Sequence, residues 1–230
     1  MKIYSKELLY SQKSQYDIDA IVLETSTSGT SSIEILENGL FELTVVGAGA
    51  GSCKNSGVTG TSIDAYATGG SGGCFKGNVN LSKGTYQVVV GAAGLSYSAM
   101  ATSITAEAGG NSQFGSIIRA NGASAASTPS ITSVSPPSYG GSVEILDSSV
   151  ISSIAQQSTG NDGPWEVAQY NSISDGGSSV HEGGYYGQGA GLGGGENLGY
   201  TIEGSIFMFW GTSDPPSVNG YVKLVYKGKQ

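Results

Sequence analysis

The sequence has little charge, and the charge that it has is mostly negative. Charged residues make up 12% of the 230 positions, and the formal net charge is -8 at pH 7. An acidic surface repels phosphate backbones and anionic lipid headgroups. We therefore expect no nucleic-acid partner and no insertion into a membrane.

Long apolar runs are also missing. The longest purely apolar runs span a few residues, as at 207–210, whereas a membrane-spanning helix needs roughly 18. The first 17 residues lack the uninterrupted apolar centre of a secretory signal peptide. We expect a protein that is made in a cytoplasm and either stays there or leaves as part of an assembly.

Residues that usually carry chemistry are scarce. Two cysteines, Cys53 and Cys74, have no Cys-x-x-Cys spacing, and we favour two free thiols over a disulfide. The one histidine, His181, has no nucleophile elbow or recognisable base partner, and the carboxylates have no distinctive spacing. We predict that the protein is not an enzyme and holds neither a metal nor a cofactor.

Glycine is abundant, with 38 residues, more than twice its roughly 7% average share. Val, Ile, Tyr and Thr are also plentiful, and these residues favour strands. Their distribution predicts an all-β fold in which β-sandwich-like sheets combine with packed glycine-rich segments and long loops. The expected strands cover residues 18–24, 33–37, 40–46, 74–81, 86–90, 112–114, 117–120, 140–146, 201–210 and 220–226.

Two local patterns predict further elements. Asn38-Gly39 separates two apolar runs, which predicts a hairpin with a type I′ turn, because Asn and Gly tolerate positive φ best. Within 147–157, apolar residues at 150, 151, 154 and 155 predict one or two turns of helix.

The glycine runs allow two interpretations. Glycine-rich segments often form mobile linkers, but here they adjoin strong strands. Several such runs can instead pack side by side as polyproline II helices whose backbone groups hydrogen-bond to their neighbours. We favour this second interpretation. The glycines that we assign to the scaffold are Gly47, Gly49, Gly51, Gly91, Gly94, Gly193, Gly194 and Gly195.

The run VVGAGAGS at 45–52 resembles a dinucleotide-binding loop at first sight. Such a loop must lead into a helix whose N-terminus meets the pyrophosphate. The residues that follow, KNSGVTGTSIDAYATGG, contain no helical apolar stripe. We therefore interpret this run as a scaffold junction.

Amphipathic side chains in the expected loops are the best candidates for binding. Tyrosine and tryptophan offer a large contact area at little rotamer cost, although they can equally cover the core. The candidate binding residues are Tyr66, Tyr97, Trp165, Tyr170 and His181.

Strands and glycine-rich runs recur along the chain in a fixed order: IEILENGLFELTVVGAGAGS (33–52), GGSGGCFKGNVNLSKGTYQVVVGAAG (69–94), GGNSQFGSIIRANGAS (109–124), GGYYGQGAGLGGG (183–195) and GYVKLVYKG (220–228). This order resembles the glycine-rich domains of bacteriophage tail-fibre and adhesin proteins. The receptor that such proteins bind would be contacted by the candidate binding residues. The resemblance implies a virion protein, encoded by a phage or prophage and synthesised in the host cytoplasm. It further implies a packed glycine core and distal loops that bind a bacterial surface protein or glycan.

We expect residues 1–32 to be an attachment segment and 33–230 a single glycine-rich β domain, with a loop-rich insertion near 124–182. Expected partners, besides the receptor, are a tail-fibre protein or further copies of the chain, such as a trimer. A purely structural fibre or virion domain is the alternative function, and an ice-binding protein is the third. Some animal receptor kinases contain a similar glycine-rich arrangement, but the missing signal peptide and scarce cysteines argue against that relation.

Overall fold

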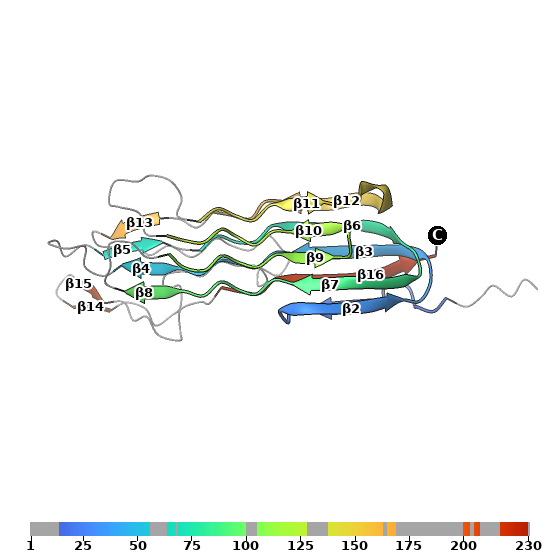
Figure 1. Cartoon of the computed structure of the whole chain (residues 1–230), viewed down its shortest axis with the longest axis horizontal. Coiled ribbons are helices and arrows are strands. Elements are labelled where there is room, and N and C mark those ends of the chain that lie inside the picture. Colours follow the sequence, from blue (N-terminus) through green and yellow to red (C-terminus); the bar gives the residue numbers. More distant parts are fainter. Residues whose placement is uncertain are drawn as a thin grey trace, which may run out of the picture.

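The protein is elongated and has three zones along its length (Figure 1). The computed structural model describes residues 14–55, 64–67, 69–99, 105–127, 138–162, 165–168, 200–202, 205–207 and 217–229. A sandwich of two five-stranded sheets forms one end, a layer of irregular extended chain forms the middle, and short strands form the other end. The C-terminus lies at the sandwich end.

Two sheets of antiparallel strands form the sandwich. The first sheet has the order β1-β16-β3-β6-β12, with bounds Ile21–Thr25, Tyr221–Gly228, Gly39–Val46, Cys74–Leu81 and Ile151–Ser158. The second has the order β11-β10-β9-β7-β2, with bounds Val143–Ile145, Ile118–Ala120, Ser112–Phe114, Gly84–Val90 and Gly29–Ile35. The predicted all-β fold is confirmed, since the only helical element in the described ranges is the 3₁₀ turn η1, Ser148–Val150.

Alternating apolar residues from both sheets fill the core. In β3 the alternating residues Phe41, Leu43 and Val45, which share one face of the strand, are fully buried. They pack in one cluster with Val222 and Leu224 of β16 and with side chains of the second sheet. Burying each large apolar side chain contributes about 1.5–3 kcal/mol, so this cluster holds the two sheets together.

The predicted hairpin at Asn38-Gly39 is wrong. Strand β2 pairs with β7 in the second sheet, whereas β3 pairs with β6 in the first. Residues 29–46 and 74–90 therefore form one antiparallel ribbon that folds over from one sheet to the other. A type I′ turn needs positive φ at both central residues, and neither Asn38 nor Gly39 is among the described residues with positive φ.

The predicted helix in 147–157 is also wrong beyond the short turn η1, because β12 occupies 151–158 as an edge strand on β6. Its register has two irregularities, and the first of them places Ile151 opposite Val79 and Ile154 opposite Gly77. Three residues of β12 thus match two of β6. An apolar spacing of three, which is typical of a helix, here places residues on one face of a bulged strand.

The other expected strands are present, but the strand expected at 33–37 is β2 at 29–35, so that 29–32, which were expected as a loop, belong to it. One further strand needs correction. The segment 201–210 was expected as one strand, but the described part contains two short strands, β14 (Tyr200–Ile202) and β15 (Ser205–Phe207), paired with each other. Glu203-Gly204 separates them in the sequence.

Beyond the sandwich, eight strands of the two sheets continue into or emerge from glycine-rich segments, which we call the glycine layer. Segments 217–220, 47–52, 69–73 and 159–162 adjoin β16, β3, β6 and β12, and segments 91–96, 106–111, 121–126 and 138–142 adjoin β7, β9, β10 and β11. Backbone hydrogen bonds join neighbouring segments within each row and between the rows. The layer therefore keeps the strand order of the sandwich.

The central segment, 47–52, has a threefold pattern of hydrogen bonds. The N–H groups of Gly47 and Ala50 donate to 69–73, at 2.9 and 3.0 Å, and those of Ala48 and Gly51 donate to 106–111, both at 3.0 Å. The partner repeats every third residue, as expected for a polyproline II helix, which has no internal hydrogen bonds. The packed glycine-rich segments expected from the sequence are therefore present.

Candidate functional site: the distal sheet

A small sheet lies at the end of the molecule farthest from the C-terminus (Figure 1). We call it the distal sheet. Its order is β13-β5-β4-β8, with bounds Trp165–Ala168, Asp64–Ala67, Cys53–Asn55 and Tyr97–Ala99. The strands come from four separate parts of the chain. Three neighbouring pairs make up the sheet, two antiparallel and one, β4 with β8, parallel.

The glycine layer brings these four strands together. Strand β4 follows segment 47–52 directly and β8 follows 91–96, while β5 and β13 connect to 69–73 and 159–162 within a few residues. Strands β4 and β8 thus extend ordered segments of the layer directly. The register of the distal sheet is therefore fixed by the hydrogen bonds of the layer as well as by its own.

Three of the five candidate binding residues belong to this sheet. One row of the register runs Trp165, Ala67, Cys53 and Tyr97, and the next runs Glu166, Tyr66, Lys54 and Ser98. Trp165 and Tyr97 thus lie on the two edge strands, and Tyr66 lies on an inner strand one row away. Tyr170 and His181 lie outside the described residues.

These three residues were expected in loops, and that expectation is wrong. Each lies in a strand of three or four residues. Such strands are too short to show an alternating pattern in the sequence. Their pairing depends on where the glycine layer delivers the chain, which no local signal reveals.

Close backbone contact explains the glycines that support the sheet. A Cβ atom on Gly51 would lie 2.1 Å from the carbonyl oxygen of Leu95, and one on Gly94 would lie 2.2 Å from that of Glu107. Gly47 and Gly91 are equally crowded, at 2.1 and 2.0 Å from backbone carbonyl oxygens. The N–H of Gly49 donates to Val218 at 3.0 Å. The remaining scaffold candidates, Gly193, Gly194 and Gly195, lie outside the described residues.

Serine side chains also accept hydrogen bonds from backbone N–H groups of the layer. The hydroxyl of Ser138, which is fully buried, accepts from the N–H of Gly70 at 2.8 Å and donates to the carbonyl of Ser124 at 2.6 Å. The hydroxyl of Ser71 accepts from the N–H of Asn161 at 2.8 Å. Sequence reasoning missed these roles, although a serine inside a glycine run, as in GGSGG, is the signal that could have indicated them.

Comparison with known families supports this architecture. Residues 25–220 match the family described as a glycine-rich domain. The chain belongs to this glycine-rich domain family. A comparison with curated proteins gives no match.

The cysteines of this glycine-rich domain lie at opposite ends of the layer. Cys53 begins β4 in the distal sheet, and Cys74 begins β6 in the sandwich. Both are buried and neither forms a disulfide, as favoured from the sequence. Burial raises the pKa of Cys74 from 9.0 to about 11. Because the thiolate is the reactive form, Cys74 is not a nucleophile at neutral pH.

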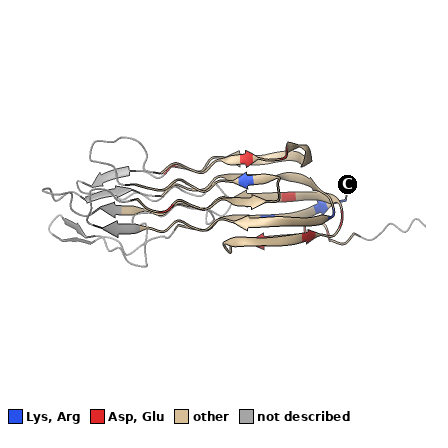
Figure 2. Cartoon of the chain, viewed as in Figure 1, with Lys and Arg blue, Asp and Glu red and all other residues tan. Residues whose placement is uncertain are grey.

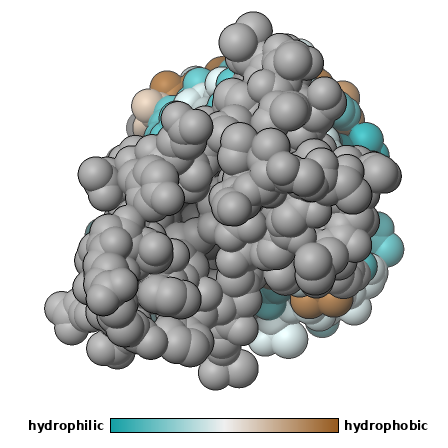
Figure 3. Space-filling view, turned by 90° about the vertical axis from the view of Figure 1, so that its left-hand side faces the viewer, coloured by the Kyte–Doolittle hydropathy of each residue, from teal (hydrophilic) through white to brown (hydrophobic). Residues whose placement is uncertain are grey.

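Charge is sparse on the described surface around the layer and concentrates on the sandwich (Figure 2). Seen from the distal end, the described residues that surround this end present mostly hydrophilic side chains with separate apolar spots (Figure 3). No group of three or more His, Cys, Asp or Glu side chains suited to a metal occurs within the described ranges. Among the same residues, no helix is long and apolar enough to cross a membrane.

Proposed function

We propose that this glycine-rich domain is the receptor-binding tip of a phage or prophage tail fibre. It binds a bacterial surface protein or glycan without catalysing a reaction. The observation that carries this proposal is the convergence of Tyr66, Tyr97 and Trp165 in one sheet at the end opposite the C-terminus. An attached domain that must touch a cell needs its binding residues at the free end.

The glycine layer supports the proposal through rigidity. A binding site on loops alone would lose conformational entropy when it orders around a receptor. Here the strands that carry the candidate residues continue from segments whose N–H groups are paired at about 3 Å. The layer reduces this cost because it holds the backbone of the distal sheet in place before binding.

The partners follow from the same arrangement. The distal sheet contacts the receptor, and the sandwich end faces a tail-fibre protein or further copies of the chain. Trimeric fibres would place one distal sheet per chain at the tip. Sedimentation mass of the purified domain distinguishes a monomer from such a trimer.

Staining of bacteria with the fluorescently labelled domain tests the proposal. We expect saturable staining of some strains in a diverse panel. The double variant Tyr66→Ala, Trp165→Ala should reduce staining at least tenfold, since buried aromatic contacts each contribute more than about 1 kcal/mol at interfaces.

Leu146→Ala is the matched control. Leu146 is an exposed apolar side chain of the sandwich, 41% accessible, and its loss should leave staining unchanged. The proposal fails if no strain is stained, or if the double variant, folded as judged by its circular dichroism, stains as well as the unsubstituted domain.

A further inference from the structure

A regular polar surface covers one side of the molecule, where the second sheet meets the glycine layer. Three columns of chain run along it: β9 with 106–111, β10 with 121–126, and β11 with 138–142. Each column contributes one strand residue and two layer residues that reach solvent. We call this set the polar face: Gln113, Asn111 and Ala108; Arg119, Asn121 and Ser124; Glu144, Ser142 and Tyr139.

The three columns are in register. Arg119 pairs with both Gln113 and Glu144 in the sheet. One row further, the side chain of Asn121 donates to the hydroxyl of Ser142 at 2.9 Å. In the last row the hydroxyl of Ser124 accepts from the N–H of Tyr139 at 2.7 Å. The two layer rows are three residues apart, about 9 Å along a polyproline II helix.

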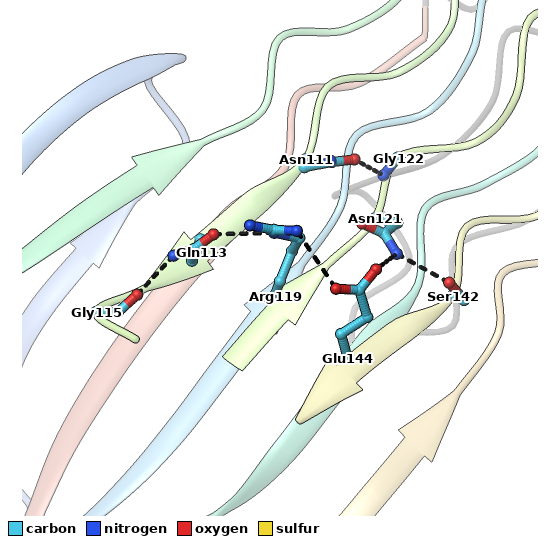
Figure 4. Close-up of polar contacts among 8 residues, drawn as sticks. All are labelled: Asn111, Gln113, Gly115, Arg119, Asn121, Gly122, Ser142 and Glu144. Carbon is cyan, nitrogen blue, oxygen red and sulfur yellow. Dashed lines mark hydrogen bonds and ion pairs between the residues drawn. The ribbon is translucent and has the colours of Figure 1, made fainter. Parts of the chain in front are cut away.

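Hydrogen bonds hold these side chains in place (Figure 4). The guanidinium of Arg119 donates to Gln113 at 2.9 Å and to Glu144 at 3.3 Å, and the amide of Asn121 donates to Glu144 at 2.9 Å. The side-chain carbonyl of Asn111 accepts from the N–H of Gly122 at 3.0 Å. Arginine has five donors and asparagine four hydrogen-bonding positions, so each side chain keeps capacity for a ligand.

The polar face is electrically balanced and has one aromatic ring. Arg119 and Glu144 are its only charged residues, and they pair with each other. Tyr139, at 55% exposure, is its one large apolar side chain. Protein interfaces typically have a central apolar cluster surrounded by polar residues. The polar face has the opposite arrangement, since amide side chains occupy its centre and its one large apolar side chain lies at its edge.

We propose that the polar face binds a neutral polysaccharide, as a second surface that is independent of the distal sheet. Neutral sugars present hydroxyl groups to amides, hydroxyls and a guanidinium, and their C–H faces pack on a tyrosine ring. The rows suit a polymer because successive sugar units can meet different groups, the amides of Asn111 and Asn121 in one row and the ring of Tyr139 in the next. An acidic polymer is disfavoured by the net charge of -8.

A printed array of purified neutral bacterial polysaccharides, with dextran and mannan beside them, tests this inference on the full chain. Hyaluronan and polysialic acid serve as acidic polymers. We expect binding to at least one neutral polymer. Tyr139→Ala and Asn111→Leu should each weaken it roughly tenfold, the loss expected for removing one aromatic or hydrogen-bonding contact.

Asn78→Leu is the matched control, because the exposed amide of Asn78 donates to Ser153 on the first sheet, away from the polar face. Binding that falls equally in this control overturns the proposal, as does binding to acidic polymers alone or to none of the polymers. The proposal is also overturned if the mass of the chain in solution doubles at high concentration and the variant Tyr139→Ala stays a monomer. The polar face would then join two copies of the chain. The variants with Tyr66 and Trp165 replaced should retain polysaccharide binding, so either proposal can fail without the other.

Discussion

At the scale of single residues, the glycine layer depends on contacts that exclude a Cβ atom. A Cβ on Gly47 would lie 2.1 Å from the carbonyl oxygen of Asn121, and one on Gly72 would lie 2.0 Å from that of Gly47. Neither residue is among the described glycines with positive φ. Glycine is required here for space between backbones, and its conformational freedom is not used.

Replacing Gly47 by alanine should therefore destabilise the fold. The added methyl group must push two hydrogen-bonded segments apart, and overpacking of this kind typically costs about 1–3 kcal/mol. Equilibrium unfolding in urea measures the loss. Ala108→Ser, at an exposed position of the same layer, should change the free energy of unfolding by less than about 0.5 kcal/mol. Equal stability of both variants would contradict the close packing.

At the scale of elements, the corner between β2 and β3 shows how tertiary contacts decide a local ambiguity. Residues 36–38 and 82–83 carry the two strands of the ribbon from one sheet to the other. The side-chain oxygen of Asn38 accepts from the N–H of Lys83 at 2.7 Å and joins the two crossings. Asn38 thus connects the two segments, 36–38 and 82–83, that cross from one sheet to the other.

This bridge predicts a difference between two variants of Asn38. Asn38→Asp keeps an acceptor for the N–H of Lys83, whereas Asn38→Ala removes it. We expect Asn38→Ala to lower the free energy of unfolding by about 1 kcal/mol, the usual value of one hydrogen bond. Thermal unfolding of the two variants measures this. If aspartate destabilises as much as alanine, the hydrogen bond does not carry the effect.

The sequence predicted the elements better than their partners. Alternation identified β3, β6 and β16, because each has one face in the core. It could not indicate that β2 pairs with β7, since the Asn38-Gly39 signal is equally compatible with a corner. Nor could it indicate the strand at 151–158, where bulges convert the period of two into three. Alternation also could not predict the convergence of Tyr66, Tyr97 and Trp165, because that convergence arises from the order of the segments in the glycine layer.

At the scale of the whole molecule, the sandwich end joins the beginning and the end of the described chain. The ring of Tyr16 packs against Phe41 and Tyr226, with centroids 6.1 and 5.3 Å apart. The carboxylate of Glu37 accepts from the hydroxyl of Ser14 and, at 3.0 Å, from the N–H of Gln15. Residues 14–16 are thereby fastened to the corner of the ribbon.

Glu37 should make this attachment sensitive to acid. The hydrogen bond from Ser14 is the main cause that lowers the pKa of Glu37 below 4.5. A carboxyl whose pKa is lower in the folded state stabilises the fold at pH values above its pKa in the unfolded chain. This stabilisation is lost as the pH falls through the pKa of the carboxyl in the folded state. We expect the free energy of unfolding, measured in urea, to fall less between pH 5 and pH 3 in Glu37→Gln than in the unsubstituted domain. Parallel curves for the two proteins would show that Glu37 does not contribute.

The central claim is that the binding end lies opposite the sandwich, and the placement of a bulky label tests it most directly. Thr105→Cys and Ser116→Cys introduce exposed thiols, the first just before segment 106–111 and the second in the turn between β9 and β10. Because both native cysteines are buried, biotin can be directed to the new thiol and then covered with streptavidin. We predict that the label at Thr105 abolishes staining of bacteria and that the label at Ser116 leaves it intact. Loss of staining with the label at Ser116, and its retention with the label at Thr105, would contradict the account.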